Sequence, residues 1–182
     1  MLRFVLSQKY TTMKTVYLLL LILFPLGLFA QKTGDELARR VFTACIKNDL
    51  NGFKRMYPSE SILTTYFKVN DKKKVFPKDV VTRCYPKGLA GAVYGFELFQ
   101  KAIKEFGLNV NDIKITGSDM VDNDIEIMQN KKKIGAVYNK FISLYFTSGG
   151  KKYAFVVPKA IEFRGRWFMG DQIVSLHEVD MY

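Results

Sequence analysis

Proton-transfer chemistry in this chain would have to use carboxylates and tyrosines, because the sequence contains a single histidine, His177. A histidine-based catalytic triad and a multi-histidine metal site are therefore not expected, and His177 is expected at a surface or strand end. A carboxylate whose pKa is raised by an apolar pocket can move a proton next to a carbonyl, with a tyrosine as its partner. The candidates for such a catalytic role are Asp171, Tyr138, Tyr145 and Tyr153.

The strand pattern separates these candidates from another acid, Glu162. Along a predicted strand Glu162 alternates out of register with Tyr153 and Phe163, so it is expected on the opposite side of the sheet. Asp171 follows Trp167 on the last predicted strand, where hydrogen bonding at a turn or pocket rim is expected, with catalysis as the alternative. We assign no catalytic residue from the sequence. The residues expected to line a binding pocket are Trp167, Tyr138 and Tyr153.

One acidic cluster has ligand types that suit calcium. It consists of Asp119, Asp122, Asp124 and Glu126. The spacing lacks the glycine and the distant glutamate of a helix-loop-helix calcium site, and residues 122–124 are instead typical of a turn. No metal and no cofactor are expected.

Two cysteines, Cys45 and Cys84, allow two interpretations. A disulfide would close a loop of about 40 residues and stabilise the fold by about 4 kcal/mol in the loop-entropy model. The alternative is two free thiols, because Cys45 lies on an apolar helical face where a thiol packs as a small hydrophobic group.

Residues 1–30 have the pattern of a cleavable signal peptide. Lys14 precedes an apolar run from Val16 to Phe24, and Ala30 is the expected last residue before the cut. The run is shorter than the roughly 20 residues that span a membrane, so no stable membrane anchor is expected after cleavage. Translation starts at Met1 or, for a more compact signal, at Met13. The sequence predicts a periplasmic or extracellular protein with one domain, residues 31–182.

The mature chain is basic. Removing residues 1–30 takes away three basic residues and no acidic one, which lowers the net charge from +11 to +8. Lysine clusters at 72–74, 131–133 and 151–152 fall in expected turns, where solvated lysines keep a protein soluble. Binding of a polyanion is the alternative, and nucleic acid is not expected for an exported protein.

The elements that position these residues are predicted by a change of hydrophobic period. Helical spacing covers residues 37–46, with Asp35 as N-cap, then a short piece headed by Asp49, residues 59–67, and residues 92–106, which end at Gly107. No clear period covers residues 68–91. From residue 111 the period is 2, and strands are predicted at 113–121, 125–128, 134–147, 153–163 and 167–176, with an edge or bulge at Pro158.

Helices followed by a meandering antiparallel sheet indicate an α+β fold. Two segments, Phe42 to Tyr57 and Gly165 to Asp171, resemble the opening helix pair and a tryptophan-bearing strand of the nuclear transport factor two-like superfamily. This resemblance implies a cone-shaped α+β barrel, in which a strongly curved mixed or antiparallel sheet packs on N-terminal helices around a pocket. The superfamily includes isomerases, dehydratases and many binding domains, so the fold does not determine the function.

Three functions agree with these observations. The first is an exported binding or accessory domain for a small apolar ligand or a protein partner. The second is a cofactor-free isomerase or dehydratase that uses a pocket carboxylate and a tyrosine. The third is a basic module that binds a protein or a polyanion. An apolar sheet face left uncovered by the helices would also favour a homodimer.

Overall fold

The computed structural model describes residues 33–70, 76–77, 79–123, 125–129, 132–137, 139–170 and 174–179, all within one compact unit. Four helices come first: α2 (Gly34–Ile46), α3 (Leu50–Lys54), α4 (Glu60–Asn70) and α5 (Val80–Glu105). The strands follow: β1 (Lys114–Asp122), β2 (Ile125–Gln129), β3 (Lys132–Val137), β4 (Lys140–Ser148), β5 (Lys151–Phe163), β6 (Arg166–Phe168) and β7 (Ser175–Glu178). The predicted order of helices before strands is confirmed.

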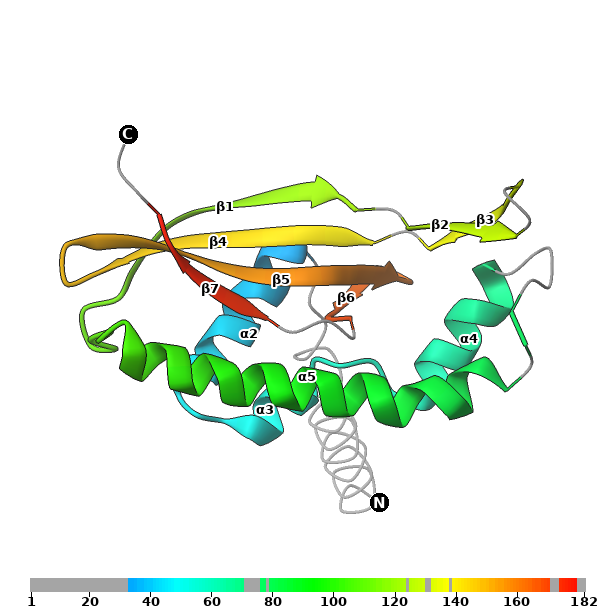
Figure 1. The fold of residues 1–182 in the computed structure, drawn as a ribbon, viewed down its shortest axis with the longest axis horizontal. Helices are drawn as coiled ribbons and strands as arrows, with labels where there is room; N and C mark the ends of the chain where they lie inside the picture. The colour runs from blue at the N-terminus through cyan, green and yellow to red at the C-terminus, as the bar shows by residue number, and fades with distance from the viewer. Residues whose placement is uncertain are drawn as a thin grey trace, which may run out of the picture. The chain divides into compact units, whose positions relative to one another are not determined.

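The main sheet has five antiparallel strands in the order β1-β4-β5-β6, with β7 also paired to β5. Helix α2 packs against β4 and β5. Helix α5 contacts α2 and β7 (Figure 1). The predicted α+β class is therefore confirmed. The sheet is not closed into a barrel by the strands described, and its strong curvature stays a prediction.

Beyond the main sheet, β2 and β3 continue the pairing of β1 and β4. Asp122 pairs with Lys140 and Ile125 with Val137, so the register is the same on both sides of the interruption. Between the two ladders, Asn123 donates through its backbone N to the Asn139 carbonyl and through Nδ2 to Asn139 Oδ1, each at 3.0 Å. Asp122 and Asn123 therefore stay paired across the sheet, which corrects the predicted turn for these two residues, and Asp124 lies outside the described residues.

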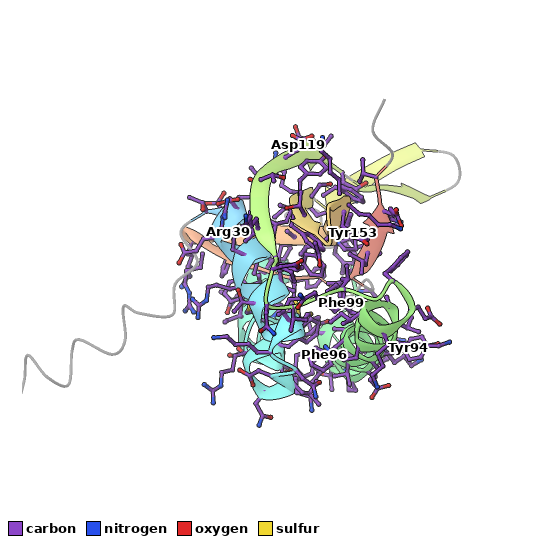
Figure 2. All side chains as sticks on the ribbon, turned by 90° about the vertical axis from the view of Figure 1, so that its left-hand side faces the viewer. Arg39, Tyr94, Phe96, Phe99, Asp119 and Tyr153 are labelled. Carbon is purple, nitrogen blue, oxygen red and sulfur yellow. The ribbon has the colours of Figure 1, made fainter. Side chains whose placement is uncertain are left out.

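A cluster of phenylalanines fills the space between the helices and the sheet. The Phe42 ring on α2 lies 4.7 Å from Phe146, 5.2 Å from Phe155 and 6.2 Å from Phe99, measured between ring centroids. Tyr153 stacks on Phe146 at 5.4 Å. Figure 2 shows Phe99 and Tyr153 among the side chains packed between α5 and the strands. The space between α2, α5 and the sheet is therefore occupied by side chains of the hydrophobic core.

An extra residue in β5 changes which side chains face this core. Val157 pairs with Ile142 but Ala160 pairs with Lys140, so three residues of β5 match two of β4. The predicted bulge at Pro158 is confirmed. Because side chains alternate along a strand, the extra residue returns Ala160 to the side of Val157 and puts Glu162 on that side too.

The predicted separation of Glu162 from Tyr153 is therefore wrong. Glu162 pairs with Trp167 of β6, which lies against Gly34 at the start of α2. Phe163, which was expected to share the side of Tyr153, instead faces α4, where its ring lies 5.7 Å from Tyr66. The odd-numbered side chains of β5 therefore point to one side of the sheet before the bulge and to the other side after it.

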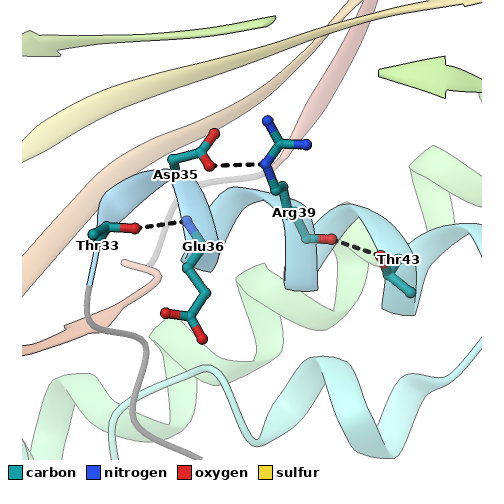
Figure 3. A network of polar contacts seen from close by, with 5 residues as sticks. All are labelled: Thr33, Asp35, Glu36, Arg39 and Thr43. Carbon is teal, nitrogen blue, oxygen red and sulfur yellow. Dashed lines mark hydrogen bonds and ion pairs between the residues drawn. The ribbon is translucent and has the colours of Figure 1, made fainter. Parts of the chain in front are cut away.

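The start of α2 also differs from the prediction. Thr33, and not Asp35, is the N-cap, and its hydroxyl accepts from the Glu36 backbone N at 3.1 Å (Figure 3). Asp35 lies one turn before Arg39, whose Nε donates to Oδ2 at 2.8 Å. This hydrogen bond, together with one from Ser118, holds the pKa of Asp35 below its usual value. The pair therefore favours the folded state at neutral pH and loses this effect as the pH falls through that pKa.

Helix α5 begins twelve residues before the predicted helix, at Val80 in place of Ala92. The sequence masks this start because glycine and proline are weak helix formers and Pro86 lies inside the helix. The buried positions nevertheless recur at helical spacing, and small residues let the helix approach its neighbours. These positions are Val81, Gly88, Ala92, Gly95, Phe96 and Phe99. The predicted cap at Asp49 and stop at Gly107 are confirmed.

We expect Phe155→Ala to lower the free energy of unfolding by about 3–5 kcal/mol, because its ring is buried and leaves a cavity when removed. The control is Phe141→Ala, since the Phe141 side chain is 39% exposed and its loss should change stability by about 1 kcal/mol or less. Chemical denaturation measures both. Equal losses for the two variants would contradict the described core.

Candidate functional site

A pocket with a volume of about 290 Å³ lies where α4, the start of α5 and the end of β5 come together. We call it the apolar pocket. Its walls are mostly aliphatic and aromatic side chains. The apolar members are Pro58, Leu63, Phe67, Val80, Val81 and Ile161. The volume is close to the lower end of the range of small-molecule sites, about 300 Å³.

Six further residues bring polar side-chain groups to the apolar pocket. They are Tyr57, Tyr66, Cys84, Tyr85, Asn139 and Lys159, and Gly170 completes the wall. Lys159 is the only charged side chain in the described lining, which contains no carboxylate. The Asn139 side chain is buried, and its Oδ1 accepts the hydrogen bond from Asn123. The described lining therefore combines tyrosine hydroxyls, an amide and an ammonium group with apolar walls.

The backbone around Lys159 is held tightly. Lys159 has a φ of 53°, in the left-handed region, as the residue that makes the bulge in β5. Gly170 lies so close that a Cβ on it would come within 2.2 Å of the Lys159 carbonyl oxygen. Only glycine fits there. This contact holds the Lys159 backbone in place at the wall of the apolar pocket.

A second hollow, of about 350 Å³, carries most of the charge in this region. We call it the charged hollow. Lys140 forms an ion pair with Asp122 in its wall, and the Arg164 guanidinium lies 5.2 Å from the centroid of the Phe163 ring. Glu162 is exposed beside them. Tyr66 and Asn139 line both spaces, so the two hollows share a wall.

The residues predicted from the sequence to form the site are dispersed. Tyr153 is 2% exposed and belongs to the core, whereas Tyr145 is 37% exposed on β4. Trp167 is buried and lines the charged hollow. Tyr138 and Asp171 lie outside the described residues. The structure therefore brings none of the described candidates into the apolar pocket.

The tyrosines that do line the apolar pocket are Tyr57, Tyr66 and Tyr85. Sequence reasoning missed them as site residues because Tyr57 and Tyr66 fall in segments with helical spacing, which indicates packing in a core. Tyr85 lies in the stretch that had no clear period. The rings of Tyr57 and Tyr85 are 5.8 Å apart, between centroids. The one local signal was Pro58, a residue that cannot continue a helix, directly after Tyr57.

Neither the histidine nor the acidic cluster adds a site in the described part of the chain. His177 is exposed on β7, with Nε2 2.9 Å from Ser175 Oγ. Asp119 accepts from the Met120 backbone N at 2.7 Å. Asp124 and the side chain of Glu126 lie outside the described residues. Among the residues that are described, no three histidine, cysteine, aspartate or glutamate side chains gather as a metal site would require.

Both cysteines are free thiols in the structure. Cys45 is fully buried on α2, and burial raises the pKa of its thiol well above the ordinary value. Cys84 lies exposed on α5 and lines the apolar pocket. The two thiols thus differ sharply in access to solvent.

The chain matches no family model, no curated protein and no solved structure at a significant level. The resemblance to the nuclear transport factor two-like superfamily therefore stays a prediction. Within the described residues, no helix combines the length and the apolar character that crossing a membrane requires.

We expect an alkylating reagent such as iodoacetamide to modify Cys84 in the native protein and to leave Cys45 unmodified. The reactive species is an accessible thiolate. Burial keeps the reagent from Cys45 and raises the pKa of its thiol, so that this thiolate does not form. Mass spectrometry after brief labelling should show one modified thiol in the native state and both after denaturation. Two unreactive thiols that appear only after reduction would instead show a disulfide.

Proposed function

We propose that this domain is a binding or accessory protein that holds a small molecule with an apolar body in the apolar pocket. The observation that carries the proposal is the pocket itself, with its apolar walls and tyrosine edge between α4, α5 and β5. We also propose that the domain is a member of the nuclear transport factor two-like superfamily, on the helix and strand motifs described above.

The distribution of packing supports this proposal. Phe42, Phe99, Phe146 and Phe155 fill the space between α2, α5 and the sheet, so that region has no room for a ligand. The apolar pocket lies at the other end of β5, beyond the bulge. Its volume is that of roughly ten water-sized groups, at about 30 Å³ each. A ligand of about ten non-hydrogen atoms fits this space.

Binding is favoured over catalysis by the groups that line the pocket. The isomerase or dehydratase alternative needs a carboxylate beside a tyrosine in an apolar site. In the described lining the tyrosines are present without a carboxylate, and Glu162 and Asp122 lie in the charged hollow. The pocket as described can hold and orient a molecule.

The proposed site can be tested with 1-octanol as an uncharged apolar probe, measured by isothermal titration calorimetry. We expect saturable binding that Leu63→Trp weakens by about tenfold or more, because the larger ring occupies the pocket. The control is Leu98→Trp, since Leu98 is exposed on α5 and does not line the pocket. Absence of saturable binding by the wild-type protein, or equal binding by Leu63→Trp, would refute the proposed site.

We further propose that the protein is exported after removal of residues 1–30, because these residues combine Lys14, an apolar run and Ala30 in the order of a signal peptide. Expression of the full chain in a secretion-competent host should yield a processed protein that begins at Gln31. N-terminal sequencing of the exported fraction measures this. A protein that keeps Met1 or Met13 would contradict cleavage.

A further inference from the structure

We propose that two copies of this chain associate through the face of the main sheet that points away from α2 and α5. This inference goes beyond the proposed function, because it names a macromolecular partner, a second copy of the chain, and the surface that binds it. It does not depend on the apolar pocket, since none of the side chains that carry it lines that pocket.

One face of the main sheet is covered by helices. On this face Phe146 lies 4.7 Å from Phe42 of α2, and Phe155 lies 5.2 Å from Phe99 of α5, measured between ring centroids. Side chains alternate along a strand, so Tyr145, which precedes Phe146 on β4, points to the opposite face. The two helices that pack on the core side therefore leave this opposite face to other contacts.

The opposite face is apolar at its centre. Val121 of β1 and Phe141 of β4 pair with each other and are 55% and 39% exposed, and Tyr145 is 37% exposed. Ala154 of β5 pairs with Tyr145, so Ala154 and Val156 share this face. We call the surface formed by these five side chains the outer face. Contiguous exposed apolar side chains of this kind mark an interaction surface.

Charge favours a second copy as the occupant of the outer face. None of its five side chains is charged, although residues 31–182 carry a net charge of +8. Two copies can therefore meet here without placing like charges at the centre of the contact, where they would be costly. A polyanion would instead require basic side chains at this centre, because its affinity comes mainly from pairing of opposite charges.

The side chains of the outer face also differ in height from strand to strand. Phe141 and Tyr145 of β4 are large and partly exposed, whereas Ala154 and Val156 of β5 are short and buried. A two-fold axis parallel to the strands, between β4 and β5, places β4 of each copy over β5 of the other. Tyr145 then lies over Ala154 of the partner subunit, twice in the dimer. The strands stay nearly aligned, which is the usual arrangement of two stacked sheets.

Polar groups at the rim agree with the same axis. Asp119 of β1 lies on the side of the strands away from α5 (Figure 2), and His177 of β7 shares that side because it pairs with Ala154. The axis brings β1 of one copy over β7 of the other, so Asp119 approaches His177 of the partner subunit. The carboxylate can keep its hydrogen bond from the Met120 backbone N, because it accepts at more than one site.

The first measurement is the molar mass of the purified protein against concentration, by sedimentation equilibrium. We expect a monomer–dimer equilibrium with a micromolar dissociation constant, as is typical of small interfaces. Tyr145→Glu should raise this constant by about tenfold or more, because it puts a charge at the centre of the contact. The matched control is Tyr94→Glu, since Tyr94 is 54% exposed on α5 and lies outside the outer face.

These results can overturn the proposal in two ways. A wild-type protein that is still monomeric at about 0.1 mM would refute self-association. Equal weakening by Tyr145→Glu and Tyr94→Glu would refute the outer face as the contact. If Tyr145→Glu does not fold, Val121→Glu replaces it, because a side chain that is 55% exposed can be changed with little effect on the core.

A mixture of two variants tests the two-fold arrangement. Tyr145→Lys and Ala154→Glu should each dimerise weakly alone, because each puts a charge against an apolar surface. Mixed in equal amounts, they should form a heterodimer in which the introduced positive charge of one copy lies over the introduced negative charge of the other. A mixture that associates no more strongly than either variant alone would overturn the assigned arrangement.

Binding of 1-octanol separates this inference from the proposed function. Tyr145→Glu should bind 1-octanol as wild-type protein does, because Tyr145 does not line the apolar pocket. Loss of 1-octanol binding together with loss of the dimer would show that the outer face and the pocket are not independent, and would contradict the inference as stated.

Discussion

Strand β5 contains one residue more than β4 between two paired positions. Ile142 pairs with Val157 and Lys140 pairs with Ala160, so two steps along β4 match three steps along β5. Most of the arrangement at that end of the sheet depends on this difference. Before the bulge, alternate side chains of β5 pack against the phenylalanines of α2 and α5. After it, the alternation is reversed, so that Phe163 contacts Tyr66 of α4. Without the extra residue, α4 would lie over the opposite set of side chains and the apolar pocket would lose its β5 wall.

The two ends of the domain differ in how their apolar side chains are used. Between α2, α5 and the sheet, aromatic rings lie at contact distances from one another and leave no space for a ligand. Around α4, the pocket wall is formed by residues of α4, α5 and β5, and α4 packs against α5. Close packing is usual in protein interiors, whereas this pocket of about 290 Å³ leaves apolar walls that a bound molecule can cover.

Polar groups in this region are organised around one buried amide. Asn139 lies between the β1–β4 and β2–β3 ladders, where it pairs with Asn123 through both backbone and side chain. A buried amide must be hydrogen-bonded to be tolerated, and this pairing satisfies its oxygen. It also places Asn139 in the wall of both the apolar pocket and the charged hollow. The hydrogen bonds at the interruption of the ladder therefore hold in place an amide, Asn139, that lines the candidate site.

The sequence by itself determined the α+β class, the order of the elements, the cap at Asp49, the stop at Gly107 and the bulge at Pro158, because hydrophobic period, capping and proline act over a few neighbouring residues. Only the tertiary structure decided where α5 begins, which tyrosines line the pocket and which way Glu162 faces. Gly88 and Gly95 lie among the buried positions of α5, and helix propensity does not register burial. The facing of Glu162 depends on counting residues across two strands, since one unpaired residue in β5 reverses every later side chain. Local patterns thus predicted the elements, and contacts between distant residues decided the site.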